Sequence, residues 1–200
     1  MKISIVTPTF NEIQNIEKLY VDIKNEIKKI NCEYEHIIID NSSTDGTIEK
    51  IKDLASKDKN LKLIINSKNY GHIRSPFYGI LQSSGDATIL MASDFQDPVE
   101  LISKYINEWK SGNKIVLGEK ITSDESKFAF SLRKLFYNFL NSISEIELTK
   151  NTTGSGIFDK SIIEKLKLIK DPYPYFRGLI AEIGDEIKTI KFNQPLREFG

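Results

Sequence analysis

The stretch ILMASDFQDPVE, residues 89–100, holds the residue types in this chain that are best suited to chemistry. An apolar run over 89–92 stops at a polar segment containing Asp94 and Asp97, and Pro98 then opens a helical pattern. A buried strand that ends in oxygen ligands beside a helix N-terminus suits a divalent cation and an anionic ligand. An ordinary polar turn would give the same pattern. Asp97 can contribute to such a cation site, but its position before Pro98 also suits a helix cap, and we favour the cap.

Three further predicted strands end in similar polar segments, at 7–12 (TPTFNE), 40–46 (DNSSTDG) and 66–72 (NSKNYGH). Because the carboxyl ends of parallel strands meet at one edge of a sheet, we expect the four segments to converge. Each alone fits turn and capping chemistry, but together they favour a nucleotide-type site. The chain lacks GxxxxGK[ST] and a GxGxxG after any strand, and we interpret Gly154-Ser155-Gly156 as a turn. A diphosphate would therefore need a cation and basic side chains to neutralise its charge.

Around these segments, runs rich in β-branched residues alternate with helical patterns. They predict strands at 3–6, 37–39, 61–65, 87–92 and 115–117, and helices at 13–30, 47–57, 75–83 and 98–110. Such alternation predicts an α/β fold with a mostly parallel central sheet and helices on both faces. Beyond residue 123 the pattern changes, and we expect a strand at 154–159, helices at 161–169 and 173–183, and a strand at 186–192.

The segment 128–143 has one helical face rich in Phe and Leu, with basic residues beside it. We favour a helix that packs on the core, and the alternative is a helix that lies at a membrane surface.

Composition excludes several classes of protein. The chain has 200 residues, enough for one well-cored domain, with 28 basic and 28 acidic side chains, which argues against a nucleic-acid partner. The single Cys32 rules out a disulfide framework and fits a reducing cytoplasm, and His36 and His72 are too few for a zinc motif. No run is long enough to span a membrane, no signal peptide is expected, and we expect the natural protein to continue beyond Gly200.

The motifs TPTFNE, IIIDNSSTDGT, KNYGHIRSPFYGI, SGDATILMASDFQDPVE and YFRGL resemble, in this order, those of family 2 glycosyltransferases with the GT-A fold. They are most similar to polyprenyl-phosphate sugar synthases of the dolichol-phosphate mannosyltransferase type. The similarity covers about residues 1–199 and is stronger over the first hundred. It implies one domain, in which residues 1–122 bind a nucleotide-sugar and residues 123–200 form the acceptor side. It also implies an inverting hexosyltransferase that works in the cytoplasm, at the inner face of a membrane.

The resemblance implies a set of donor-binding residues at the ends of the first four strands: Pro8, Phe10, Glu12, Asp40, Asn41, Asn69, Gly71, Ser93 and Asp94. Among these, Pro8, Phe10 and Glu12 would line the nucleoside pocket, and Asp40 would hydrogen-bond the base. The cation, Mg²⁺ or Mn²⁺, would bind Asp94 and Gln96. Basic side chains would hold the diphosphate or an acceptor phosphate, so the catalytic candidates are Asp94, Lys120, Arg177 and Arg197.

Two positions depart from the family pattern. Ala92 stands where the family has the first carboxylate of its DxD metal motif, and an alanine side chain cannot bind a cation. We therefore expect weaker metal affinity, with Asp94, Gln96, water and the substrate diphosphate as ligands. Lys120 stands where the family often has arginine, which keeps the charge but loses the bidentate geometry.

The resemblance suggests as acceptor a polyprenyl phosphate or a cell-envelope glycan precursor, with possible contact to a membrane surface. A lipid phosphate is already ionised and needs no general base, whereas a hydroxyl acceptor needs one. Ala92 leaves open a second function, a nucleotide-sugar-binding protein that has lost catalysis. A nucleotidyltransferase is disfavoured, because it usually needs a basic, glycine-rich loop after the first strand, where this chain has the acidic TPTFNE.

Overall fold

The structure is a computed structural model that describes residues 1–121 and 152–195. The expected helix at 128–143 and the candidate Arg197 lie outside the described residues. Within the described part of the chain, no helix is long and apolar enough to cross a membrane.

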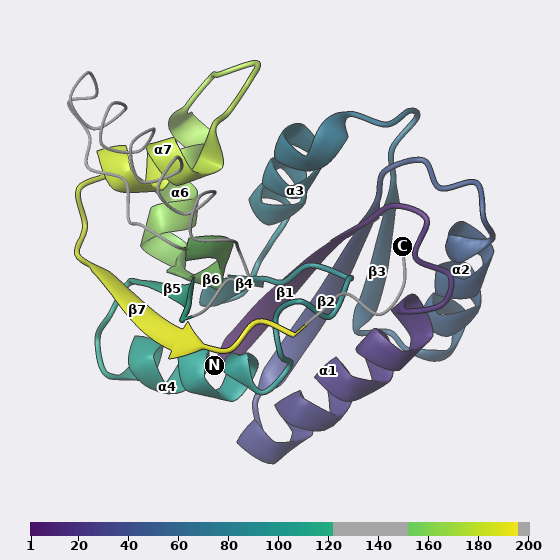
Figure 1. The fold of residues 1–200 in the computed structure, drawn as a ribbon, viewed down its shortest axis with the longest axis horizontal. Coiled ribbons are helices and arrows are strands. Elements are labelled where there is room, and N and C mark those ends of the chain that lie inside the picture. The colour runs from purple at the N-terminus through teal and green to yellow at the C-terminus, as the bar shows by residue number, and fades with distance from the viewer. Residues whose placement is uncertain (122–151, 196–200) are drawn as a thin grey trace, which may run out of the picture.

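A seven-stranded sheet forms the centre of the described structure (Figure 1). Its strands are β1 (Lys2–Thr9), β2 (Glu33–Asp40), β3 (Leu61–Ile65), β4 (Ala87–Leu90), β5 (Ile115–Lys120), β6 (Thr152–Asp159) and β7 (Ile187–Phe192). They lie in the order β3-β2-β1-β4-β6-β5-β7. The pairs β1–β2, β1–β4, β2–β3 and β5–β7 are parallel, and β6 runs antiparallel to both β4 and β5. The expected mostly parallel sheet is confirmed, and the strand expected at 154–159 is present as part of β6, but its antiparallel direction was not predicted.

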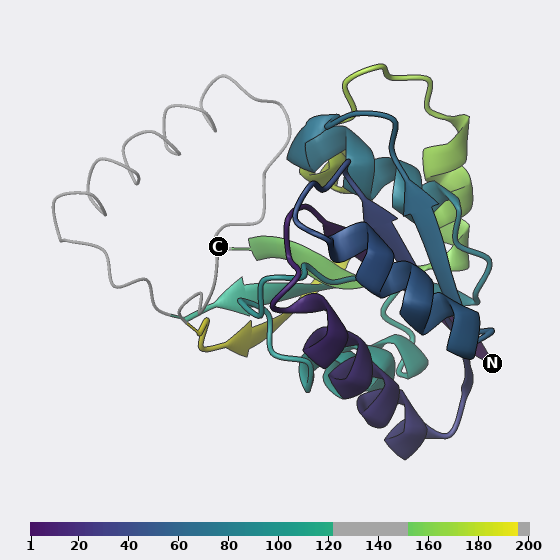
Figure 2. The same cartoon turned by 90° about the vertical axis from the view of Figure 1, so that its right-hand side faces the viewer.

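Helices cover both faces of the sheet (Figures 1 and 2). They are α1 (Ile16–Ile30), α2 (Thr47–Lys57), α3 (Gly71–Leu81), α4 (Leu101–Lys110), α6 (Lys160–Leu168) and α7 (Phe176–Glu182). The helices α1, α2 and α4 lie on one face, and α3, α6 and α7 lie on the other.

Alternation of side chains along the strands builds separate apolar clusters on the two faces of the sheet. Ile3 and Ile5 of β1 pack with α1 and α4 in one apolar cluster, whereas Val6 packs with α3 and α6 in the other. Strand β2 divides in the same way, with Ile38 toward α1 and α2 and Ile37 toward α3. A strand buried on both faces must be apolar on both faces, which explains the unbroken isoleucine run in β2.

Most expected elements are present with shifted ends. The helix 47–57 and the strand 61–65 match their predicted bounds, whereas α3 begins four residues before the predicted 75 and α4 begins at Leu101 instead of Pro98. The interpretation of 154–156 as a turn is wrong, because these residues belong to β6. Gly156 pairs there with both Leu90 and Leu117, and a Cβ atom on it would lie 2.3 Å from the Val116 carbonyl oxygen.

Candidate active site

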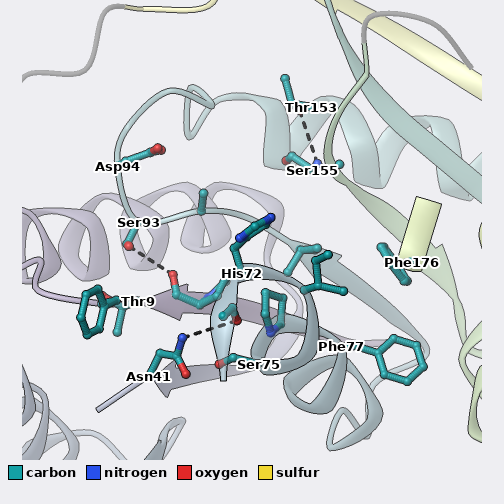
Figure 3. A pocket seen from close by; sticks show the side chains of 18 of the residues that line it. Thr9, Asn41, His72, Ser75, Phe77, Ser93, Asp94, Thr153, Ser155 and Phe176 are labelled. Carbon is teal, nitrogen blue, oxygen red and sulfur yellow. Dashed lines mark hydrogen bonds between the residues drawn. The ribbon is translucent and has the colours of Figure 1, made fainter. Parts of the chain in front are cut away.

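A cavity of about 790 Å³ opens at the carboxyl ends of the central strands (Figure 3). All four polar segments reach it, and the start of β6 and the N-terminal end of α7 complete its wall. Nine of the predicted site residues line it: Pro8, Phe10, Glu12, Asn41, Asn69, Gly71, Ser93, Asp94 and Arg177. The sequence separation of these residues is large, so it is the parallel sheet that brings them together.

The loop after β1 is fixed by the loop after β2. Asn11 has a left-handed backbone (φ 54°), and its side-chain oxygen accepts a hydrogen bond from the Thr44 amide at 2.9 Å. The Asn11 amide donates to the Ser43 hydroxyl at 2.8 Å. Glu12, the next residue, has 6% of its surface exposed. Its carboxylate accepts a hydrogen bond from the Asn15 side chain at 2.5 Å. Glu12 is therefore held in the cavity wall by its own helix start.

Asp40 is fully buried at the end of β2 and does not line the cavity. Its two carboxylate oxygens accept hydrogen bonds from the Ser43 amide at 2.8 Å and the Ser43 hydroxyl at 2.5 Å. This arrangement closes the turn in which Ser42 takes a left-handed backbone (φ 70°). Asp40 thus shapes the loop beside the cavity, and its contact with a base stays a prediction.

Asn41 joins the loop after β2 to the loop after β3. Its side-chain oxygen accepts hydrogen bonds from the Tyr70 amide at 2.8 Å and the Asn66 side chain at 3.1 Å. Its side-chain nitrogen donates to Asn69 Oδ1 at 2.7 Å and to the Gly71 carbonyl at 3.4 Å. The Asn41 side-chain amide is therefore fully used within the protein, where it positions the loop that contains Asn69 and Gly71, and its contact with a donor stays a prediction.

The loop after β4 carries the predicted cation ligands. Ser93 donates to the Pro8 carbonyl at 3.1 Å, which ties this loop to the loop after β1 (Figure 3). Asp94 is half-buried and lines the cavity, and its Oδ1 accepts a hydrogen bond from the Gln96 amide at 3.1 Å. Phe95 between them has a left-handed backbone (φ 58°). The Gln96 side chain is not among those that line the cavity, so its role as a ligand stays a prediction.

Asp97 is the residue of this loop that sequence reasoning placed wrongly. It does not cap α4, because that helix begins at Leu101 with Glu100 as its N-cap residue. A turn closed by the Leu101 amide and the Pro98 carbonyl, 3.0 Å apart, separates Asp97 from the helix. Asp97 instead lines the cavity with 5% of its surface exposed.

The electrostatics of Asp97 are unusual for a carboxyl group. Burial raises its pKa to about 6, and the negative charge of Asp94 adds to that rise, while Thr153, Lys120 and Ser155 act in the opposite direction. Its Oδ1 is buried and has no hydrogen-bond partner within the described chain. Perturbed carboxyl groups inside cavities are frequent in functional sites.

The basic candidates occupy different places. Arg177 lines the cavity beside Gly154. Because Gly154 has no side chain, the Arg177 guanidinium group has room, whereas a Cβ on residue 154 would lie 3.4 Å from Arg177 Nε. Gly154 also has a left-handed backbone (φ 87°). Lys120 does not line the cavity, and its ammonium group donates to the Gln194 side chain at 2.9 Å.

Sequence reasoning gave no role to several other lining residues. His72 ends the third polar segment, which was expected at the site, but Thr153 and Ser155 gave no signal, because their approach depends on β6 lying antiparallel beside β4. Across residues 1–121 and 152–195, no group of three or more His, Cys, Asp or Glu side chains could hold a metal ion. A cation here would need water or substrate oxygens besides Asp94, which Mg²⁺ commonly uses.

Comparison with solved structures places the fold. Glucosyl-3-phosphoglycerate synthase from Mycobacterium tuberculosis, solved with Mn²⁺, uridine-diphosphate and phosphoglyceric acid, matches with a TM-score of 0.66 at 18% identity, over 100% of this chain and 71% of that one. The mannosyltransferase PcManGT from Pyrobaculum calidifontis, solved with GDP-Man and Mn²⁺, gives a TM-score of 0.62 at 17% identity, over 98% of this chain and 58% of that one. The fold is that of the GT-A glycosyltransferases.

The family follows from the sequence comparison. The model of glycosyl transferase family 2 matches residues 4–168, and the chain belongs to that family. Among curated relatives, the bactoprenol glucosyl transferase of Shigella phage SfV is 29% identical over 203 residues, which cover 100% of this chain and 66% of the relative. The putative glycosyltransferase CsbB of Bacillus subtilis is 27% identical, over 99% of this chain and 60% of the relative. The chain thus spans about 60–66% of the length of these two relatives.

Proposed function

We propose that this chain is the donor-binding part of an enzyme that transfers a sugar from a nucleotide-diphosphate donor to a polyprenyl phosphate. The observation that carries the proposal is the cavity that Glu12, Asn69, Asp94 and Arg177 line together. Its volume of about 790 Å³ falls in the usual range of small-molecule sites, roughly 300–1,000 Å³. Family membership and the structural relatives support the transfer chemistry.

The charges along the cavity suit a nucleotide-sugar. When bound at Asp94, a divalent cation would neutralise the diphosphate and stabilise it as a leaving group. Arg177 lines the cavity from the start of α7, and its guanidinium group can bind a phosphate by two hydrogen bonds. We assign Arg177 to a phosphate, of the donor or of the acceptor. The side chains of Pro8 and Phe10 offer an apolar wall for the nucleoside.

The acceptor is inferred from relatives. The bactoprenol glucosyl transferase of phage SfV supports a lipid phosphate, although this chain covers 66% of it. A lipid phosphate is ionised at neutral pH, so it can attack without a general base when it is held in line with the anomeric carbon. We further propose that the protein works at a membrane surface on the cytoplasmic side. Binding to liposomes that contain polyprenyl phosphate tests this, and indifference to those liposomes would argue for a water-soluble acceptor.

The donor is best identified by thermal shift with UDP-, GDP- and dTDP-sugars, because a ligand that binds the folded chain raises its stability. With the donor known, we expect Asp94→Ala to abolish transfer to polyprenyl phosphate while the melting curve stays unchanged. Asp53→Ala, on the exposed surface of α2, is the matched control and should transfer at the wild-type rate. Full turnover by folded Asp94→Ala protein would remove Asp94 from the mechanism.

Ala92 supports a second candidate, a nucleotide-sugar-binding protein without catalysis. Its methyl group lines the cavity where the family resemblance expects a carboxylate. Under this alternative, the donor would raise the melting temperature but would be neither hydrolysed nor transferred. A transfer assay with the donor that raises the melting temperature separates the two functions.

A further inference from the structure

We propose that Asp97 acts with Asp94 as a carboxylate ligand of the cation, in place of the carboxylate that Ala92 cannot provide. This inference rests on the proposed nucleotide-sugar function, because it names a residue of the same site. It assigns to this chain a cation site whose second carboxylate comes five residues after Ala92, from the same loop after β4.

Burial and missing partners are the first support. Asp97 is 5% exposed, yet its Oδ1 atom is buried without a hydrogen-bond partner in the described part of the chain. A buried carboxylate oxygen without a partner is costly, and proteins normally satisfy such groups with a donor, a water or an ion. The side chain that carries this atom lines the cavity, so the unsatisfied oxygen lies beside the space that a ligand would occupy.

The path of the loop is the second support. Phe95 takes a left-handed backbone (φ 58°), which a bulky L-residue rarely adopts. The chain reverses there, and the Gln96 amide turns back to hydrogen-bond Asp94 Oδ1 at 3.1 Å. As a result Asp94 and Asp97 line the same cavity, while the Gln96 side chain does not. Unusual backbone conformations of this kind are concentrated at ligand sites.

Charge is the third support. Two carboxyl groups that face one cavity repel each other, and a divalent cation between them removes the repulsion. No cationic side chain removes this repulsion, because Asp97 makes no ion pair with any described residue. The nearby Lys120 ammonium group donates instead to the Gln194 side chain at 2.9 Å. The hydroxyl groups of Thr153 and Ser155 lie beside Asp97, where they can hold its carboxylate in the orientation that a cation ligand needs.

The test measures Mn²⁺ binding by electron paramagnetic resonance, first with Mn²⁺ alone and then with UDP or GDP present. We expect Asp97→Asn to weaken Mn²⁺ binding at least about tenfold, as Asp94→Asn does, because each removes a ligand charge. The exposed Asp53→Asn removes the same charge outside the cavity and should leave binding unchanged. Adding Ala92→Asp to Asp97→Asn should restore affinity, since it returns a carboxylate at the family position.

Two results would overturn the inference: wild-type affinity in folded Asp97→Asn protein, or no Mn²⁺ binding by the wild-type chain under either condition. Rescue by Ala92→Asp shows that any loss in Asp97→Asn does not come from misfolding. Failure of the proposed function looks different, because Mn²⁺ binding through Asp97 would persist in a protein that transfers no sugar.

Discussion

His36 gives the sharpest test of the electrostatics in this fold. It lies in β2 with 1% of its surface exposed, its ring stacked on Tyr20 and its Nε2 atom 2.9 Å from the Thr7 hydroxyl. Burial lowers its pKa from the usual 6.5 to about 4, although the charge of Asp58 acts in the opposite direction. The folded chain therefore keeps this imidazole neutral where the unfolded chain protonates it.

The direction and size of the effect follow from proton linkage. The stabilisation from neutral His36 is complete above pH 6.5 and is lost as the pH falls toward about 4, because the unfolded state binds the proton first. The difference of about 2.5 pH units corresponds to about 3 kcal/mol of unfolding free energy. Asp97 opposes this trend below pH 6, since its raised pKa makes the folded state bind a proton first.

Comparison with a variant isolates the histidine. His36→Gln has no titrating group and can keep a hydrogen bond to Thr7, whereas the contribution of Asp97 is the same in both proteins. Urea unfolding in EDTA at pH 7 and pH 4.5 gives the two free energies. We expect wild type to lose about 2–3 kcal/mol more than His36→Gln between these pH values. Equal losses in the two proteins would refute a buried neutral His36.

Three further predictions concern packing, an ion pair with a buried carboxylate, and metal removal. Gly156→Ala should cost at least about 2 kcal/mol in urea unfolding, because its Cβ would lie 2.3 Å from the Val116 carbonyl; wild-type stability would mean that β6 can shift. Glu35→Ala should cost about 2 kcal/mol at pH 7, since the buried carboxylate accepts from Ser4 at 2.6 Å and Lys62 at 2.5 Å. Because these donors lower the pKa of Glu35 to about 2, the cost should persist above pH 4.5 and shrink as the pH falls toward 2. EDTA should weaken nucleotide-sugar binding in titration calorimetry, and unchanged affinity would show a metal-independent site.

The first hundred residues were predictable because local signals and tertiary structure agree there. The helix 47–57 begins after the Asp45-Gly46 turn, and Asp45 accepts from the Thr47 amide at 3.0 Å, as its turn chemistry suggests. The four polar segments also meet as expected, because strand direction alone places them at one edge of the sheet.

What sequence could not supply depends on contacts between distant segments. Asp97 was assigned to a helix cap because Pro98 commonly opens a helix, but here a separate turn intervenes before Leu101. Asn41 was predicted only as a donor-binding residue, and its hold on the next loop could not be foreseen, because it depends on the positions of Asn69 and Gly71.

The position of β6 makes the two parts of the chain inseparable. Residues 152–159 enter the sheet between β4 and β5, both of which precede them in sequence. A fragment cut at residue 121 would retain β4 and β5 without the strand that joins them, and each would present bare backbone amide and carbonyl groups to solvent. Unpaired strands of this kind recruit other chains, so such a fragment should aggregate instead of folding into a smaller nucleotide-binding unit.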